Sequence, residues 1–112
     1  MALLNFGAKD KKLVNRKSDL ENFLRGFSIE VMPRTAGKIK DFRELLPRGT
    51  RVYIAHLEDT PIEEMVATAK RITLEGYDVM PHFPARTIKN KETLKNWIAM
   101  YQGEANVSQA LL

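Results

Sequence analysis

The sequence predicts an α/β fold, a parallel βαβαβαβ succession that forms about half of a (β/α)8 barrel and follows a short N-terminal helix. Three observations support this prediction. Short β-prone segments begin near residues 27, 51, 77 and 107. Segments with helical periodicity separate them, and parallel strands require connections of that length. The chain has 112 residues, whereas a complete barrel needs roughly 250.

The composition is that of a globular protein without a membrane span. Hydrophobic residues make up 44% of the chain and charged residues 29%, which is too apolar for intrinsic disorder. The chain has no cysteine, and this excludes disulfides and thiolate chemistry. No apolar run approaches the roughly 18 residues of a membrane span, and no secretory signal pattern opens the chain. We therefore expect a cytoplasmic protein.

We assign residues 1–17 to a basic, flexible arm and residues 18–112 to the partial barrel domain. Residues 1–26 carry six basic and three acidic side chains, a balance compatible with nucleic-acid contact. However, residues 9–17, which hold most of these basic side chains, include no aromatic residue for base stacking, and no helix-turn-helix pattern follows. A solvated leader is the favoured interpretation, and nucleic acid is not an expected partner.

The first elements are predicted from a cap, a glycine and a proline. Ser18 and Glu21 have the spacing of a capping box, which predicts a short helix from about residue 19 to Gly26. The β-prone segment 27–33 follows and is the first predicted strand, with Glu30 near its carboxyl end. A helix is then expected from Gly37 to residue 46, because four apolar positions share one helical face: Ile39, Phe42, Leu45 and Leu46.

The central helix carries the strongest local signal. It follows a second predicted strand at residues 51–57. Thr60, Pro61 and Glu63 supply a cap, a proline at the first helical position and the second half of a capping box. Gly76 is placed to end the helix. Its expected inner face consists of Ile62, Met65, Val66, Ala69 and Ile72.

Two further strands and a helix complete the prediction. Residues 77–84 form the third strand, whose two prolines suggest that its far end faces a site and does not pair in a ladder. Asn90 is expected to cap the last helix, which should end at Gly103. Residues 107–112 form the fourth strand. The expected inner face of the helix is Leu94, Trp97, Ile98 and Tyr101.

Three candidate chemical groups lie near the carboxyl ends of predicted strands, where α/β folds place their active groups. Glu30 is either a general acid, because an apolar strand disfavours its ionised form, or a carboxylate paired with a cation such as Arg34. His82 is a ligand contact, a base or a structural group. We assign no chemical role to His56 from its sequence neighbours. These residues do not have a recognisable metal-ligand spacing, so no metal site is expected.

The same segments resemble those of the methylenetetrahydrofolate reductase family, particularly its short bacterial members. The likeness is carried by F-S-I-E-V-M-P-R at 27–34, R-V-Y-I-A-H-L at 51–57, M-P-H-F-P-A-R at 80–86 and Q-A-L-L at 109–112. The segments occur in the family's order. The likeness runs from about residue 26 to residue 112 and corresponds to the amino-terminal half of the family's barrel.

The resemblance implies a flavin-dependent reductase. Family members bind FAD, which takes hydride from a nicotinamide cofactor and reduces methylenetetrahydrofolate to methyltetrahydrofolate. Glu30 matches the family's catalytic acid, and His82 matches a histidine that lies beside the flavin. Where relatives carry a hydroxyl residue near the end of the second strand, this chain has Ala55 or, in the other register, His56. The family's later strands supply most of the flavin and folate site.

Association is expected if the chain is an enzyme, because four parallel strands leave an unpaired edge and an exposed apolar face. Either a homo-oligomer or a separately encoded complementary half-barrel would complete the site for folate and the nicotinamide donor. The alternative is a catalytically inactive half-barrel fragment or interaction module. It would bind no flavin.

Overall fold

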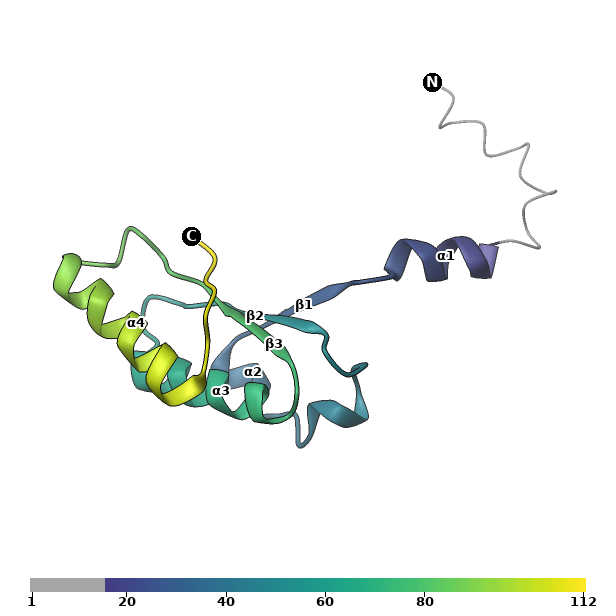
Figure 1. Cartoon of the computed structure of the whole chain (residues 1–112), viewed down its shortest axis with the longest axis horizontal. Coiled ribbons are helices and arrows are strands. Elements are labelled where there is room, and N and C mark those ends of the chain that lie inside the picture. Colours follow the sequence, from purple (N-terminus) through teal and green to yellow (C-terminus); the bar gives the residue numbers. More distant parts are fainter. Residues whose placement is uncertain (1–15) are drawn as a thin grey trace, which may run out of the picture.

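The computed structural model describes residues 16–112, and they form a mixed α/β fold around a three-stranded parallel sheet (Figure 1). The strands are β1 (Ser28–Val31), β2 (Arg51–Ile54) and β3 (Asp78–Pro81), in that order across the sheet. Parallel pairing of all three is as predicted. The predicted arm falls outside the described residues except for residues 16 and 17.

Helices cover one face of the sheet. The elements are α1 (Arg16–Leu24), the single turn α2 (Pro33–Ala36), the 3-10 turn η3 (Phe42–Glu44), α3 (Ile62–Leu74) and α4 (Lys91–Ala105). Figure 1 shows α2, α3 and α4 on the same side of the strands, whereas α1 projects away from them. Alternate strand residues are buried beneath these helices, namely Val31, Val52, Ile54, Val79 and Pro81.

Helix α3 is the centre of the core, and the predicted apolar stripe explains why. Met65, Val66, Ala69 and Ile72 are all at most 1% exposed. The expectation that Gly76 ends this helix is confirmed, because Gly76 adopts a φ of 98°, which is costly for residues with a Cβ. The predicted Thr60 cap is wrong. Pro61 occupies the N-cap position, and it makes no side-chain capping bond.

The boundaries of the outer helices differ in part from prediction. Ser18 lies inside α1, so it does not cap that helix. The Asn90 cap of α4 is confirmed, since its side-chain oxygen accepts a 2.8 Å hydrogen bond from the Thr93 amide. Gly103 does not end α4. The helix continues to Ala105 and closes at Asn106, whose left-handed φ of 53° lets the Val107 amide bond to the Tyr101 carbonyl.

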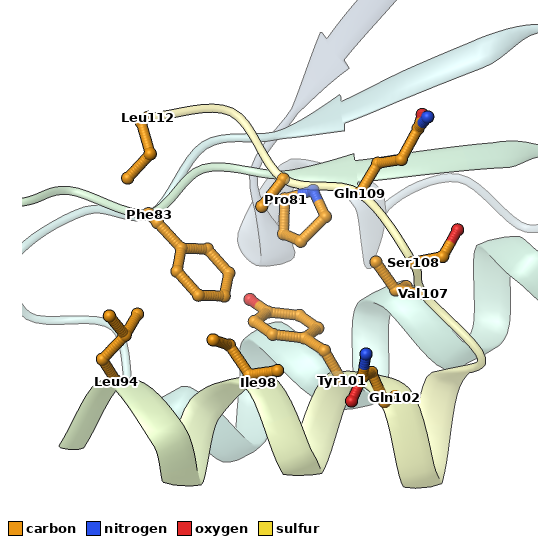
Figure 2. A pocket seen from close by; sticks show the side chains of 11 residues that line it. Pro81, Phe83, Leu94, Ile98, Tyr101, Gln102, Val107, Ser108, Gln109 and Leu112 are labelled. Carbon is orange, nitrogen blue, oxygen red and sulfur yellow. The ribbon is translucent and has the colours of Figure 1, made fainter. Parts of the chain in front are cut away.

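The predicted fourth strand is reduced to one bridged position. Leu111 forms a parallel bridge with His82. The Leu111 amide donates to Pro81 at 2.9 Å, and the Leu111 carbonyl accepts from Phe83 at 2.7 Å. Figure 2 shows the segment from Val107 to Leu112 running beside the end of β3. The segment therefore lies where a fourth strand would pair, but residues 107–110 form no ladder.

The helix predicted from Gly37 to residue 46 is wrong, and a side chain of α3 holds this segment in its observed form. Arg71 donates to the carbonyl of Ala36 at 2.9 Å, to that of Lys40 at 3.2 Å and also to that of Ile39. The Ala36 carbonyl also accepts a hydrogen bond from the Ile39 amide at 3.1 Å, which is three residues later and not the four of an α-helix. The connection keeps only α2 and η3 as helical turns.

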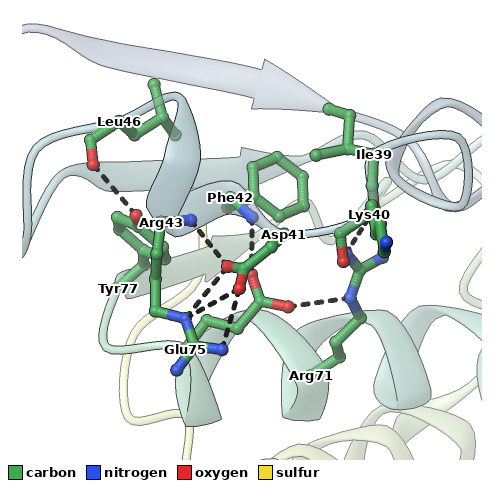
Figure 3. A network of polar contacts seen from close by, with 9 residues as sticks. All are labelled: Ile39, Lys40, Asp41, Phe42, Arg43, Leu46, Arg71, Glu75 and Tyr77. Carbon is green, nitrogen blue, oxygen red and sulfur yellow. Dashed lines mark hydrogen bonds and ion pairs between the residues drawn. The ribbon is translucent and has the colours of Figure 1, made fainter.

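Glu75 completes this network (Figure 3). Its carboxylate accepts a hydrogen bond of 3.0 Å from Arg71 Nε and one of 2.9 Å from the Phe42 amide. The Glu75 side chain is only 13% exposed. The Arg71 guanidinium also lies 5.3 Å from the centre of the buried Phe42 ring. Arg71 and Glu75 together clamp the β1–β2 connection onto α3.

The outer part of the same connection is held by shorter contacts. Asp41 accepts from the backbone and side chain of Arg43, and these hydrogen bonds lower the pKa of Asp41. Tyr77 donates 3.0 Å to the Leu46 carbonyl. These contacts fix the loop that the predicted helix would have occupied.

No helix among residues 16–112 is long and apolar enough to cross a membrane.

Candidate functional site

Glu30 and His82 meet on the helix-free face of the sheet, the face that none of the described helices covers (Figure 1). Glu30 lies opposite Tyr53 in the β1–β2 register, and the His82 amide donates to Ile54 just beyond β3. Both side chains follow the strand alternation that points away from the buried Val31 and Pro81. Glu30 Oε1 lies 3.0 Å from His82 Nε2. Two predicted site residues, 52 positions apart in the sequence, are thus in contact.

Glu30 and His82 are close enough for an ion pair, but the two side chains do not form a hydrogen bond. His82 Nε2 is shielded from solvent yet has no hydrogen-bond partner among residues 16–112, although the Glu30 oxygen is close enough for an ion pair. The His82 side chain is 29% exposed and that of Glu30 is 57% exposed. Tyr53 lies between them across the sheet, with its ring edge-to-face with the imidazole at 6.2 Å.

The environment of Glu30 differs from the expected one. The sequence suggested a desolvated carboxylate, but only one face of β1 is covered, and Glu30 is on the other. Arg34 is not an ion-pair partner of Glu30 among the described residues. The ionisable side chain in contact with the Glu30 carboxylate is that of His82.

An ion pair occupies the opposite end of the same face. Arg51 Nε lies 2.7 Å from Asp78 Oδ2, and this carboxylate raises the pKa of Arg51. Arg51 also donates 3.3 Å to Gln109 of the C-terminal segment. The helix-free face is therefore polar at both ends, with Tyr53 and Met80 between.

The two second-strand candidates separate onto opposite sides. The Ala55 amide donates a hydrogen bond of 2.8 Å to the Val31 carbonyl. Ala55 therefore continues the strand alternation of Arg51 and Tyr53, and it lies on the helix-free face. His56 instead packs on Trp97 of α4, with ring centroids 4.9 Å apart. His56 Nε2 lies 2.9 Å from the Thr60 carbonyl and must be the protonated nitrogen. His56 is structural and does not join Glu30 and His82.

Tyr53 is the residue at this site that sequence reasoning missed. The signal was its position, because residues 51, 53 and 55 alternate with the apolar pair at 52 and 54. Together, a carboxyl group and an imidazole meet at one edge of the sheet, with the Tyr53 ring beside the imidazole. Such a set has the donors and acceptors for moving a proton to or from a bound molecule.

No cluster of three or more possible metal ligands occurs in the part of the chain that the structure describes. A scan of the chain against models of known protein families finds no match.

Proposed function

We propose that this chain is a cytoplasmic methylenetetrahydrofolate reductase-type half-barrel that works as part of a larger assembly. The observation that carries the proposal is the contact between Glu30 and His82 at the carboxyl ends of β1 and β3. These are the two residues whose surrounding motifs resemble the family's catalytic acid and flavin-side histidine. Their 3.0 Å separation joins the two motifs at one place.

The layering of the fold supports a barrel origin. Doubly wound α/β folds place helices on both faces of the sheet, whereas a (β/α)8 barrel places them only outside. Here α2, α3 and α4 lie on a single face (Figure 1). The C-terminal segment bridges to His82 on the free side of β3, where a fourth barrel strand belongs.

The helix-free face has one side chain suited to the edge of a flavin ring. The His82 imidazole is 29% exposed on this face, and it would supply a hydrogen bond to a ring oxygen or nitrogen. FAD, when bound, would supply hydride transfer from a nicotinamide donor to methylenetetrahydrofolate. Glu30 would deliver the proton that opens the folate's methylene bridge.

An assembly is required because the site is open in the single chain. Glu30 is 57% exposed, and a proton-transfer site works best where water is excluded. Strand β1 forms an edge of the described sheet and leaves backbone groups without ladder partners. Leu20, Phe23 and Leu24 on α1 are 57%, 85% and 47% exposed, which is typical of an interaction surface. A second copy or a complementary half-barrel would cover both the edge of β1 and the exposed apolar side chains of α1.

Flavin binding and assembly are tested together by sedimentation of the purified chain with FAD, monitored at the flavin's visible absorbance. We expect flavin to sediment with a species larger than one chain. A colourless monomer at every concentration would contradict the proposal for a self-assembling enzyme. A mixture with candidate complementary chains then tests the second form of assembly.

Removing the imidazole should weaken flavin binding. We expect His82→Ala to raise the dissociation constant for FAD about tenfold, the effect of losing one hydrogen bond in a closed site. Fluorescence quenching of FAD measures it. Asp78→Asn, at the far end of the same face, is the matched control and should leave the affinity within about twofold. Equal FAD affinities for the wild type and both variants would show that His82 does not contact the flavin.

Replacing the most exposed aromatic residue of α1 should weaken the assembly. Phe23 is 85% exposed in the single chain, so Phe23→Ser should not disturb the core. Burying a Phe side chain contributes about 2 kcal/mol, and we therefore expect the association constant to fall at least about tenfold. Sedimentation equilibrium of both proteins gives the constants. An unchanged constant would show that α1 lies outside the interface.

A non-catalytic interaction module is the second candidate, and Ala55 favours it. Relatives carry a hydroxyl residue near that position, and alanine offers no polar contact to a flavin. Under this alternative the chain associates through the same surfaces but binds no FAD. The sedimentation experiment separates the two candidates, because an assembled but colourless species supports only the module.

A further inference from the structure

A groove lies on the helix-covered side of the sheet, between α4 and the C-terminal segment 107–112 (Figure 2). Its volume is about 310 Å³. Two apolar side chains are open to solvent at its mouth, since Ile98 is 39% exposed and Leu112 is 90% exposed. The rest of the lining combines apolar side chains such as Pro81, Phe83 and Leu94 with the polar Gln102, Ser108 and Gln109. Apolar groups bordered by polar ones are typical of a protein–protein interface.

Helix α1 carries an apolar face that its own chain does not cover. None of its residues is buried. Leu20, Phe23 and Leu24 have the spacing of a single helical face, and each is at least 47% exposed. Figure 1 shows α1 extending away from the sheet beyond β1. The groove lies at the other edge of the sheet, beside β3, so the two apolar surfaces of one chain do not meet.

The connection from α1 to β1 has the same form as the connection from α3 to β3. Each consists of three residues with a central glycine, residues 25–27 and residues 75–77. Gly26 has a φ of 72° and Gly76 a φ of 98°. The second connection returns α3 along the sheet (Figure 1). A Cβ at Gly26 would meet nothing within 4 Å, so the first connection is unpacked and leaves α1 free to turn back beside a strand.

The two open edges of the described sheet have complementary backbone groups. The Val31 carbonyl accepts a hydrogen bond from the chain just after β2, and alternate residues of a parallel strand bond to the same neighbour. The backbone groups of Glu30 therefore face the open edge of β1. At the other edge, Leu111 bonds to the end of β3 through both its amide and its carbonyl, so those of Ala110 and Leu112 face outward. A parallel strand β1 from another copy fits this edge.

We propose that the chain forms a twofold dimer in which α1 of each copy lies in the groove of the other, beside α4. This inference rests on the half-barrel proposed above and names its partner as a second copy. Strand β1 of each copy then pairs with residues 107–112 of the other. Parallel α/β connections are right-handed and keep the helices on the outer side, so the helix that precedes an incoming β1 arrives beside α4.

The size of the two surfaces is sufficient for a stable dimer. Each copy contributes the nine residues of α1, the four of β1 and the eleven that line the groove. A standard interface has roughly 20 to 30 residues per side. Three strands and the C-terminal segment from each copy also make up the eight strand positions of a closed (β/α)8 barrel.

Cross-linking between cysteine variants tests the contact directly, because the chain has no cysteine of its own. Leu20→Cys and Ile98→Cys proteins are mixed without FAD and treated with a short bismaleimide. Leu74→Cys replaces Leu20→Cys in the control, since Leu74 is 76% exposed but lies on α3, outside the groove. We expect at least about tenfold more mixed product with Leu20→Cys, because groups held side by side react at an effective concentration in the mM range.

A charge placed in the groove should weaken the dimer. We expect Ile98→Asp to lower the association constant at least about tenfold, because an unpaired carboxylate would be buried against the apolar face of α1. Asn96→Asp places the same charge on a part of α4 outside the groove, and its association constant should stay within about twofold of the wild type. Sedimentation equilibrium measures both.

Several outcomes would overturn the inference: a chain that stays monomeric, an assembly whose main product links Leu20 to Leu20, or equal yields with Leu74→Cys. Equal association constants for Ile98→Asp and Asn96→Asp would also overturn it. A dimer that links Leu20 to Ile98 but binds no FAD would support this arrangement and contradict only the proposed reductase.

Discussion

Replacing Arg71 with methionine is expected to lower the free energy of unfolding by about 3 kcal/mol, at the low end of the cost of breaking a buried charged network. The methionine keeps much of the apolar stem but removes the donors to three carbonyl groups of the β1–β2 connection. It also leaves Glu75, which is 13% exposed, without its cation. Because Arg71 itself is 33% exposed, water would recover part of the loss.

Urea unfolding monitored by Trp97 fluorescence measures this change, since the chain has a single tryptophan. Arg43→Met is the control, because Arg43 is 64% exposed and pairs with Asp41 on the surface. Exposed ion pairs contribute little, so its unfolding midpoint should stay close to that of the wild type. Equal midpoints for the two variants would contradict the assignment of Arg71 as the clamp of this connection.

The second large effect is expected on catalysis. Glu30→Gln should lower the rate of methyltetrahydrofolate formation by the assembled protein at least about a hundredfold, the usual effect of losing a general acid. Glutamine has nearly the size of glutamate and keeps an oxygen that faces His82, but it has no acidic proton to deliver. Flavin affinity should therefore remain within about twofold of the wild type.

Single-turnover reaction of the reduced flavin with methylenetetrahydrofolate isolates this step from the nicotinamide half-reaction. Asp78→Asn again serves as the control, since Asp78 lies on the same face but at its other end, paired with Arg51. It should react at the wild-type rate. A Glu30→Gln protein that reduces folate as fast as the control would refute the proposed role of Glu30.

The parts of the fold that were predictable depend on local signals. The stripe from Met65 to Ile72 and the Asn90 cap are local, and both agree with the structure. The absence of the helix expected from Gly37 to residue 46 was not predictable, because the contacts that Arg71 makes with this segment span more than 30 positions. The spacing of Arg71 and Glu75 is that of a surface helix pair, and nothing in it indicates a contact with a distant loop.

The candidate site was predictable in its members but not in its geometry. Parallel strands place their carboxyl ends at one edge, which predicted Glu30 and His82 as neighbours of that edge. Their direct contact depends on the strand order and register, and no local pattern specifies these. His56 shows the same limit, since it lies one position past Ala55 and this single step sends it to the opposite side, against Trp97.

Backbone amide spectra of the full chain, recorded with and without FAD, test the central proposal most directly. The account predicts that the largest shifts occur on the helix-free face, at Tyr53, Ala55 and His82, and that they saturate with the same midpoint as the flavin's absorbance. Largest shifts on α4, or none at saturating FAD in an assembled chain, would contradict it.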